Sequence, residues 1–133
     1  MKDALAVMLG GAVGSLARWL VNVFFAQFAW AASFPLATLS VNVTGSFGIG
    51  VLAGILSEEG LLTSPPTVRN LIMAGFFGGY TTFSSFSLQT LDLARNNAFF
   101  SACMNVLLSV ALSLCAVWLG SFTAHYLNGA SLK

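Results

Sequence analysis

The chain contains 133 residues, of which 57% are hydrophobic and only 7% are charged, and its formal net charge is +1. Soluble globular domains carry roughly 25% charged residues, so this composition excludes an ordinary cytosolic domain. We expect a lipid bilayer around the chain and no nucleic-acid partner.

Four apolar stretches are long enough to cross a bilayer, since a spanning helix needs about 20 residues. They cover residues 4–25, 35–56, 69–91 and 98–125. The connections between them are short, which predicts one compact membrane domain over residues 1–133. The expected fold class is therefore all-α, an integral membrane protein with four transmembrane helices.

The first stretch carries Gly10, Gly14 and Arg18, which are four residues apart and share one helix face. Arg18 is the only cation well inside a predicted span, and no acidic residue lies at membrane depth to pair with it. It should reach water or an anion, or extend to the interface. At a pore mouth it would raise the local concentration of anions, which indicates anions as cargo.

The second stretch repeats the same spacing with Thr38, Asn42, Ser46, Gly50 and Gly54. Paired glycines four apart let membrane helices approach closely, so we interpret Gly50 with Gly54, like the pair in the first stretch, as helix contacts. Asn42 has two interpretations. It either bonds between helices or lines a pore, and we favour the pore because an amide can offer N–H groups to a passing ion.

The third stretch contains the segment GGYTTFSSFS at residues 78–87. Paired glycines followed by β-branched threonines disfavour a continuous helix. Hydrocarbon tolerates a broken backbone only where it is buried in protein or lines a cavity. We therefore predict a break in the third helix, with Phe83, Phe86 and Ser87 beside a pore, because an aromatic ring has a positive edge that can face an anion.

The fourth stretch has an unbroken polar row made of Ser101, Asn105, Ser109 and Ser113. This row is longer than helix packing needs, and its hydroxyl groups could serve a moving ion in succession. Cys103 and Cys115 lie twelve positions apart on the same stretch, too far to pair with each other, and we interpret them as packing residues.

The charged residues favour a passive pathway. The acidic residues all fall at span ends or in loops, whereas proton-coupled transport usually relies on an intramembrane acid. Catalysis has no support either, because His125 stands alone and no nucleophile has a base beside it.

Lysine and arginine are almost balanced between the two membrane faces, with three residues on one side and two on the other. The chain could insert in one orientation or in both, and the second case would permit an antiparallel homodimer. The residues on the first side are Lys2, Arg69 and Lys133, and those on or toward the second are Arg95 and Arg18.

Three blocks of the chain resemble the Fluc (CrcB) family of fluoride channels: GGAVGSLARW at residues 10–19, TLSVNVTGSF at 38–47 and GFFGGYTTFSSF at 75–86. The resemblance implies passive, selective export of fluoride from the cytoplasm through the bacterial inner membrane. It also implies an antiparallel, dual-topology homodimer with two pores and a structural sodium ion at the dimer interface.

The resemblance also implies roles for particular residues. It assigns the vestibule to Arg18, and the sodium ligands to the backbone carbonyls of Gly78 and Thr81. Asn105 departs from the family, whose members often carry tyrosine there. The fluoride pore would be lined by Asn42, Phe83, Phe86, Ser87, Asn105, Ser109 and Ser113.

Two other kinds of protein are compatible with a small chain of four spans. One is a small multidrug-type proton-coupled antiporter, but such transporters have an essential glutamate in the first span and this chain has none there. The other is a structural subunit that only packs through its glycine pairs, which does not account for the rows of hydroxyl groups.

Overall fold

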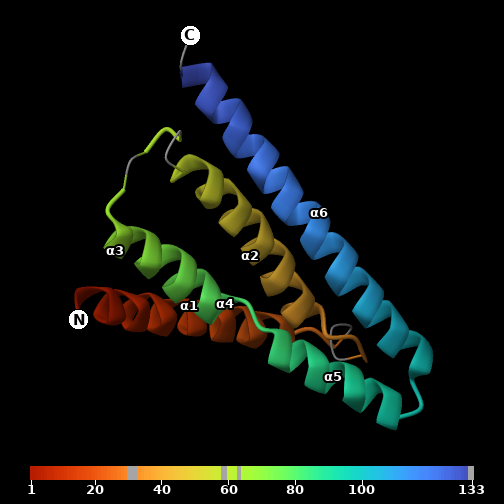
Figure 1. Cartoon of the computed structure of the whole chain (residues 1–133). Coiled ribbons are helices and arrows are strands. Elements are labelled where there is room, and N and C mark those ends of the chain that lie inside the picture. Colours follow the sequence, from red (N-terminus) through yellow and green to blue (C-terminus); the bar gives the residue numbers. More distant parts are fainter. Residues whose placement is uncertain (30–32, 58–59, 63, 132–133) are drawn as a thin grey trace.

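The structure is a computed structural model that describes residues 1–29, 33–57, 60–62 and 64–131. Its described part is helical and contains no strand. The helices are arranged as an open, elongated bundle (Figure 1). They are, in chain order, α1 (Lys2–Ala26), α2 (Leu36–Ile55), α3 (Pro66–Arg69), the π-helix η2 (Asn70–Phe77), α4 (Gly78–Tyr80), α5 (Phe83–Arg95) and α6 (Phe99–Ser131).

Three helices of the described part are long and apolar enough to cross a membrane, namely α1, α2 and α6. The remaining predicted crossing is divided: α3, η2 and α4 follow one another without a gap, and α5 begins after an interruption. The prediction of an all-helical chain with a break in its third crossing is confirmed. α6 extends beyond the predicted residues 98–125, because the helix continues through the polar residues that follow the apolar stretch.

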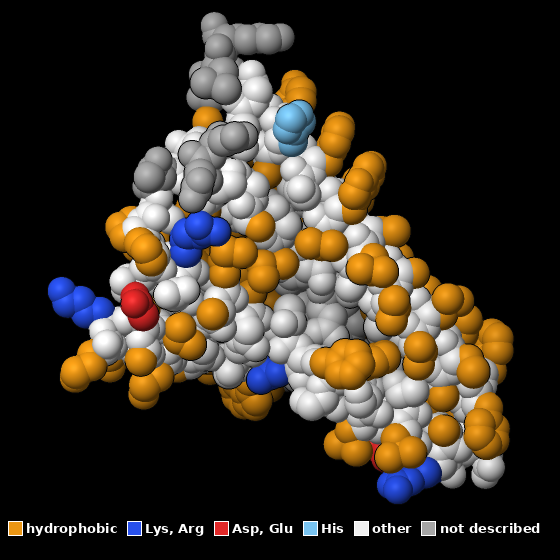
Figure 2. Space-filling view, in the orientation of Figure 1, with side chains coloured by type: hydrophobic (Ala, Val, Ile, Leu, Met, Phe, Trp, Pro, Cys, Tyr) orange, Lys and Arg blue, Asp and Glu red, His pale blue; other side chains and the backbone are white. Residues whose placement is uncertain are grey.

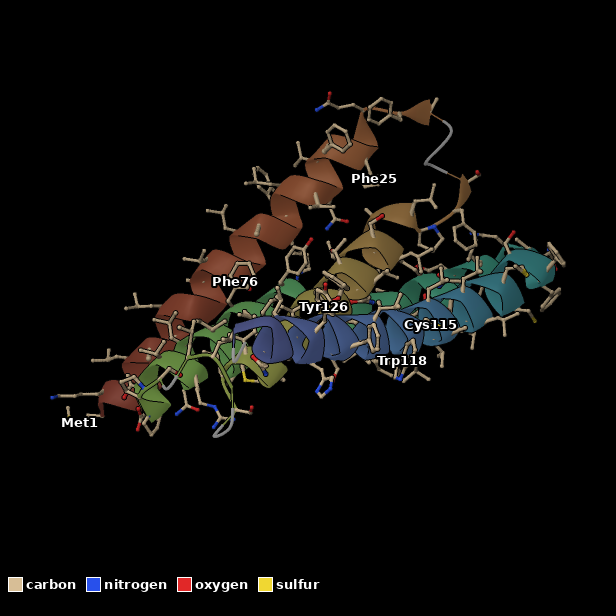
Figure 3. The ribbon with its side chains drawn as sticks, turned by 90° about the horizontal axis from the view of Figure 1, so that it is seen from above. Met1, Phe25, Phe76, Cys115, Trp118 and Tyr126 are labelled. Carbon is tan, nitrogen blue, oxygen red and sulfur yellow. The ribbon has the colours of Figure 1, made fainter. Side chains whose placement is uncertain are left out.

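The helices pack in two groups. α2 and α6 run side by side along much of their length, and α1 lies against η2 and α4 (Figure 1). Seen from above, α1 diverges from α6 toward Phe25 (Figure 3). α5 connects the two groups, since it follows α4 along the chain and packs against α6.

Glycine makes both groups possible. A methyl group added at Gly14 would meet the carbonyl oxygen of Phe76, and one added at Gly50 would meet the carbonyl oxygen of Val117. The helix backbones are therefore in direct contact, as expected for small residues at membrane helix interfaces. The interpretation of both glycine pairs as contact points is confirmed, because a methyl group at Gly10 would meet the Leu71 carbonyl and one at Gly54 the Ala124 side chain.

A tight turn brings α6 back against α5. Asn97 has a φ of 60°, a left-handed conformation that asparagine tolerates better than most residues. The Ala98 N–H donates to the Leu93 carbonyl at 2.9 Å and the Asn97 N–H donates to the Ala94 carbonyl at 3.1 Å. These two bonds form a Schellman motif, which ends α5 and reverses the chain. The reversal places Thr90 of α5 opposite Asn105 of α6.

Most of the surface is apolar. Hydrophobic side chains are spread over the visible face, whereas charged side chains are few, most of them at its left side and lower right and one near its middle (Figure 2). Lipid chains can solvate such a surface, so this distribution is that of a multi-pass membrane protein. Cys103 and Cys115 are exposed free thiols on α6, so the interpretation that they pack is wrong within one protomer. The α6 face that meets α2 is instead lined by small residues, including Gly120.

Candidate functional site

The break in the third crossing falls on two threonines. Thr81 and Thr82 are extended, with ψ angles of 159° and 115°, between the end of α4 and the start of α5. The Thr82 hydroxyl accepts a hydrogen bond from the Ser85 N–H at 3.2 Å and so caps α5. Gly78, Gly79 and Tyr80 remain helical, so the interruption begins at Thr81, after the paired glycines.

Asn42 of α2 holds the broken backbone. Its amide nitrogen donates to the Thr82 carbonyl at 3.1 Å, and its amide oxygen accepts from the Thr82 N–H at 2.8 Å. Thr82 is buried, so both of its backbone groups would be costly to leave unpaired. The structure thus contains the interhelical bond that the sequence left as the second interpretation. Asn42 also faces a cavity, and its contact with an ion stays a prediction.

Arg18 of α1 lies beside the same break. Its guanidinium donates to the Thr81 carbonyl at 3.3 Å, and the residue is half-buried. Carbonyl oxygens at the end of a helix carry partial negative charge and favour a nearby cation. The main chain therefore supplies the partner that we sought in water or an anion. The sequence could show that no carboxylate is available to Arg18, but it could not show a carbonyl partner, because the helix end that exposes this carbonyl depends on where the break falls.

The backbone around Gly78 and Thr81 is suited to sodium. In a continuous helix the Thr82 N–H would donate to the Gly78 carbonyl, but here it donates to Asn42. Gly78 is exposed, and nothing lies within 4 Å of where its side chain would be. Unwound carbonyls at helix ends are known sodium ligands in membrane proteins. In the described part of the chain, no three His, Cys, Asp or Glu side chains lie together as a metal site.

A cavity of about 430 Å³ lies between α2, α6 and the broken crossing. The residues that line it in the described structure are uncharged. Five of the predicted pore residues contribute to its wall, and so do both predicted sodium ligands. The five are Asn42, Phe83, Phe86, Ser109 and Ser113.

Two predicted pore residues are not part of the cavity wall. Ser87 is exposed, and its hydroxyl donates to the Phe83 carbonyl of its own helix at 2.9 Å. Serine commonly bonds to its own helix in this way, so the hydroxyl is already used. Asn105 is buried behind the wall, where it contacts Ser109.

Phe83 and Phe86 form a pair at the start of α5. Their ring centroids are 5.2 Å apart and their planes are tilted by 51°. The two rings have different surroundings, since 76% of Phe83 is exposed and only 7% of Phe86. Both line the cavity. Phe86 therefore also belongs to the protomer core, whereas Phe83 extends beyond it.

A hydrogen-bonded chain connects α5 with α6 behind the cavity. The Asn105 amide nitrogen donates to the Thr90 hydroxyl at 2.8 Å, and the Ser109 hydroxyl donates to the Asn105 amide oxygen at 3.4 Å. Thr90 and Thr82 are two residues whose importance we did not predict from the sequence. The signal for Thr90 was present, because it lies four residues after Phe86 on the face that carries the predicted pore residues.

The chain matches one family model, described as "CrcB-like protein, Camphor Resistance (CrcB)", over residues 5–121. It is similar to the protein named "Fluoride-specific ion channel FluC" of Opitutus terrae, with 47% identity over 133 residues, covering 100% of this chain and 98% of that protein. The protein of the same name from Paramagnetospirillum magneticum is 47% identical over 122 residues, covering 92% and 94%. That of Methylobacterium radiotolerans is 46% identical over 127 residues, covering 96% and 87%.

Proposed function

Because the chain belongs to the CrcB-like protein family, we propose that it is a passive, fluoride-selective ion channel. It exports fluoride from the cytoplasm across the bacterial inner membrane. The names of the similar proteins support this function, since each is called a fluoride-specific ion channel. The observation that carries the proposal is the uncharged cavity at the helix break, which combines hydroxyl groups with aromatic rings, including those of Phe83 and Phe86.

The cavity wall offers a small anion replacements for its water. Ser109 and Ser113 provide hydroxyl donors one helix turn apart, and Phe83 and Phe86 provide ring edges with positive character. An ion conducts only where binding is strong enough for entry and weak enough for release. Because the described wall contains no cation, an anion there meets only dipoles, and this arrangement favours release.

The charges of the pathway also indicate that transport is passive. An antiporter driven by protons needs an acid in the membrane that loads and releases a proton. The cavity wall of the described structure contains no carboxylate. Fluoride would therefore move down its own gradient. The multidrug-type antiporter has no observation in its favour here.

The finer architecture that we propose is an antiparallel, dual-topology homodimer with two pores. Two features support a second copy. Phe83 lines the cavity yet has 76% of its surface exposed, so one protomer covers only part of this ring. The almost balanced lysine and arginine residues would permit insertion in both orientations. In a dimer whose copies contact each other through the same surface, the exposed Phe83 rings of the two copies would lie in symmetry-related positions.

We further propose that a structural sodium ion binds at the dimer interface. The carbonyl oxygens of Gly78 and Thr81 would hold it, because the first has lost its helical donor and the second belongs to the residue that ends α4. The positive charge of sodium would be attracted to these carbonyl oxygens and would hold them close to one another. Arg18 already donates to the Thr81 carbonyl, and that oxygen retains a second lone pair for the ion.

Fluoride efflux from liposomes tests the proposed function. The purified protein is reconstituted with fluoride or chloride inside, and efflux is followed with an ion-selective electrode. We expect rapid fluoride efflux and far slower chloride efflux. Equal rates for the two ions, or no efflux of either, would remove the proposal of a fluoride-selective channel.

A further inference from the structure

Asn105 is a buried amide immediately behind the cavity wall. Its side chain is 1% exposed, less than any other buried polar residue of the described chain. It does not line the cavity, but Ser109, one helix turn further along α6, does. Asn105 can therefore affect an ion in the cavity through Ser109, the cavity-lining residue that its side chain contacts directly.

The neighbouring bonds fix the orientation of the Asn105 amide. Thr90 has one hydroxyl proton, which it donates to the Phe86 carbonyl at 2.8 Å. The Thr90 oxygen can then only accept, and the Asn105 amide nitrogen donates to it at 2.8 Å. The amide oxygen of Asn105 consequently faces Ser109.

This orientation directs the Ser109 proton away from the cavity. The Ser109 hydroxyl donates to the Asn105 amide oxygen at 3.4 Å. Its lone pairs are then available on the remaining side, and lone pairs repel an anion. A hydroxyl turns about a single bond, however, and 3.4 Å is long for an O–H···O bond. A hydrogen bond to an anion is stronger than one between neutral groups. When an anion arrives, the Ser109 hydroxyl can therefore turn from the Asn105 amide oxygen and donate to the anion instead.

We infer that Asn105 is a positioning residue that sets how tightly the cavity holds its anion. This inference rests on the proposed channel function. When the Ser109 hydroxyl turns to the anion, the Asn105 amide oxygen is left in a buried position without its donor, which is unfavourable. That cost is recovered when the anion leaves and Ser109 turns back. Asn105 thus opposes binding and favours release.

The decisive variant is Asn105→Leu, which keeps a similar side-chain volume and removes the competing acceptor. Fluoride flux is measured in liposomes over a range of fluoride concentrations. The half-saturating concentration should fall by roughly two- to tenfold, the equivalent of one weak hydrogen bond, and the maximal flux should fall with it. Thr123→Val is the matched control on α6, because the Thr123 hydroxyl donates only to the Leu119 carbonyl of its own helix.

A second comparison separates positioning from a general structural effect. If Asn105 acts through Ser109, its substitution should cause no further change in the half-saturating concentration of the Ser109→Ala variant. An unchanged value in Asn105→Leu, or an equal fall in both backgrounds, would overturn the inference. Should Asn105→Leu fail to assemble, Asn105→Ala removes the same acceptor without added branching. Absence of flux in the unsubstituted protein would remove the channel proposal itself, so the two failures are distinguishable.

Discussion

At the scale of single residues, Asn42 has a structural duty as well as its place in the cavity wall. Both ends of its amide bind Thr82: the oxygen accepts from the N–H that the break leaves without a helical acceptor, and the nitrogen donates to the carbonyl. Asparagine is suited to this because a single side chain carries a donor and an acceptor. An ion that used the Asn42 amide would compete with the bonds that keep the break in place.

We expect Asn42→Ala to lower stability and flux together. The buried Thr82 N–H would lose its acceptor, at a cost of about 1–3 kcal/mol. Thermal unfolding of the protein in detergent measures the first effect and liposome flux the second. Asn22→Ala is the control, because the Asn22 amide donates to the Arg18 carbonyl within the same helix. Equal stability of both variants would contradict a stabilising role of the two Asn42–Thr82 bonds.

The two phenylalanines should differ when each is replaced by isoleucine. Phe83→Ile removes an exposed ring and should suppress flux while leaving stability unchanged, because ring edges and not bulk are proposed to face the ion. Phe86→Ile should suppress flux and also lower stability, since Phe86 is buried. Phe100→Ile provides the control, as Phe100 is 79% exposed and lies on α6 outside the cavity wall. Full flux in Phe83→Ile would show that this ring serves packing alone.

Residue types could be predicted better than residue partners. Asn42, Ser109 and Ser113 were recognisable because polar groups at regular spacing on a membrane helix are unusual. The partners of Arg18 and Asn105 could not be predicted in the same way. One is a main-chain oxygen at a helix end and the other a threonine on a neighbouring helix, and both depend on how the helices cross.

At the scale of elements, the glycines of α1 decide how closely the two helix backbones approach. Phe76 lies beside α1 (Figure 3), and its carbonyl leaves no room for a side chain at Gly14. Gly79 meets the backbone of Gly11 in the same contact. These contacts hold α4 close to α1, so that the Arg18 guanidinium can donate to the Thr81 carbonyl.

Gly14→Ala should therefore destabilise the protein although alanine is the better helix former. Overpacking against the Phe76 backbone costs about 1–3 kcal/mol unless the helices move apart. Gly129→Ala is a matched control, since nothing lies within 4 Å of the side-chain position at Gly129. Unfolding midpoints in detergent provide the measurement. If both variants had the same midpoint, the close approach of α1 and η2 would be refuted.

The break itself was predictable, but its form was not. The sequence indicated an interruption because β-branched residues follow paired glycines, yet both glycines stay helical and the extended residues are the threonines. The π-helix η2 was not predicted at all. A π-helix has backbone hydrogen bonds between residues five apart, and an α-helix between residues four apart. Nothing in the order of the η2 residues favours one spacing over the other, so the choice depends on the surroundings of the helix.

At the scale of the whole molecule, a single protomer leaves many large apolar side chains exposed. Its described core is small, and large apolar side chains such as Trp118 and Phe122 are exposed along α6. Lipid can cover apolar groups, but it cannot satisfy main-chain oxygens at a helix break. This is the physical reason why we propose that sodium and a second copy meet the carbonyl groups around Gly78.

Removal of sodium should abolish flux. The protein would be purified and reconstituted with a large organic cation in place of sodium, and fluoride efflux would be measured before and after sodium is returned. We expect loss and then recovery, because backbone oxygens at membrane depth are costly when unsatisfied. A potassium arm controls for ionic strength. Full activity throughout the sodium-free arm would exclude the central site.

The two exposed thiols on α6 are natural attachment sites for probes that measure distances between two copies of the chain. Cys103 and Cys115 are separated by about 18 Å along the helix axis, at 1.5 Å per residue. Spin labels attached to one cysteine at a time would report the spacing between equivalent sites in two copies. Labels on unlike cysteines, Cys103 in one copy and Cys115 in the other, complete the comparison. Antiparallel copies centred near Ser109 bring these unlike sites to the same level, so they lie closer together than equivalent sites, whereas copies that point the same way give the reverse order. The outer face of a single helix can thus reveal which way its twin is inserted.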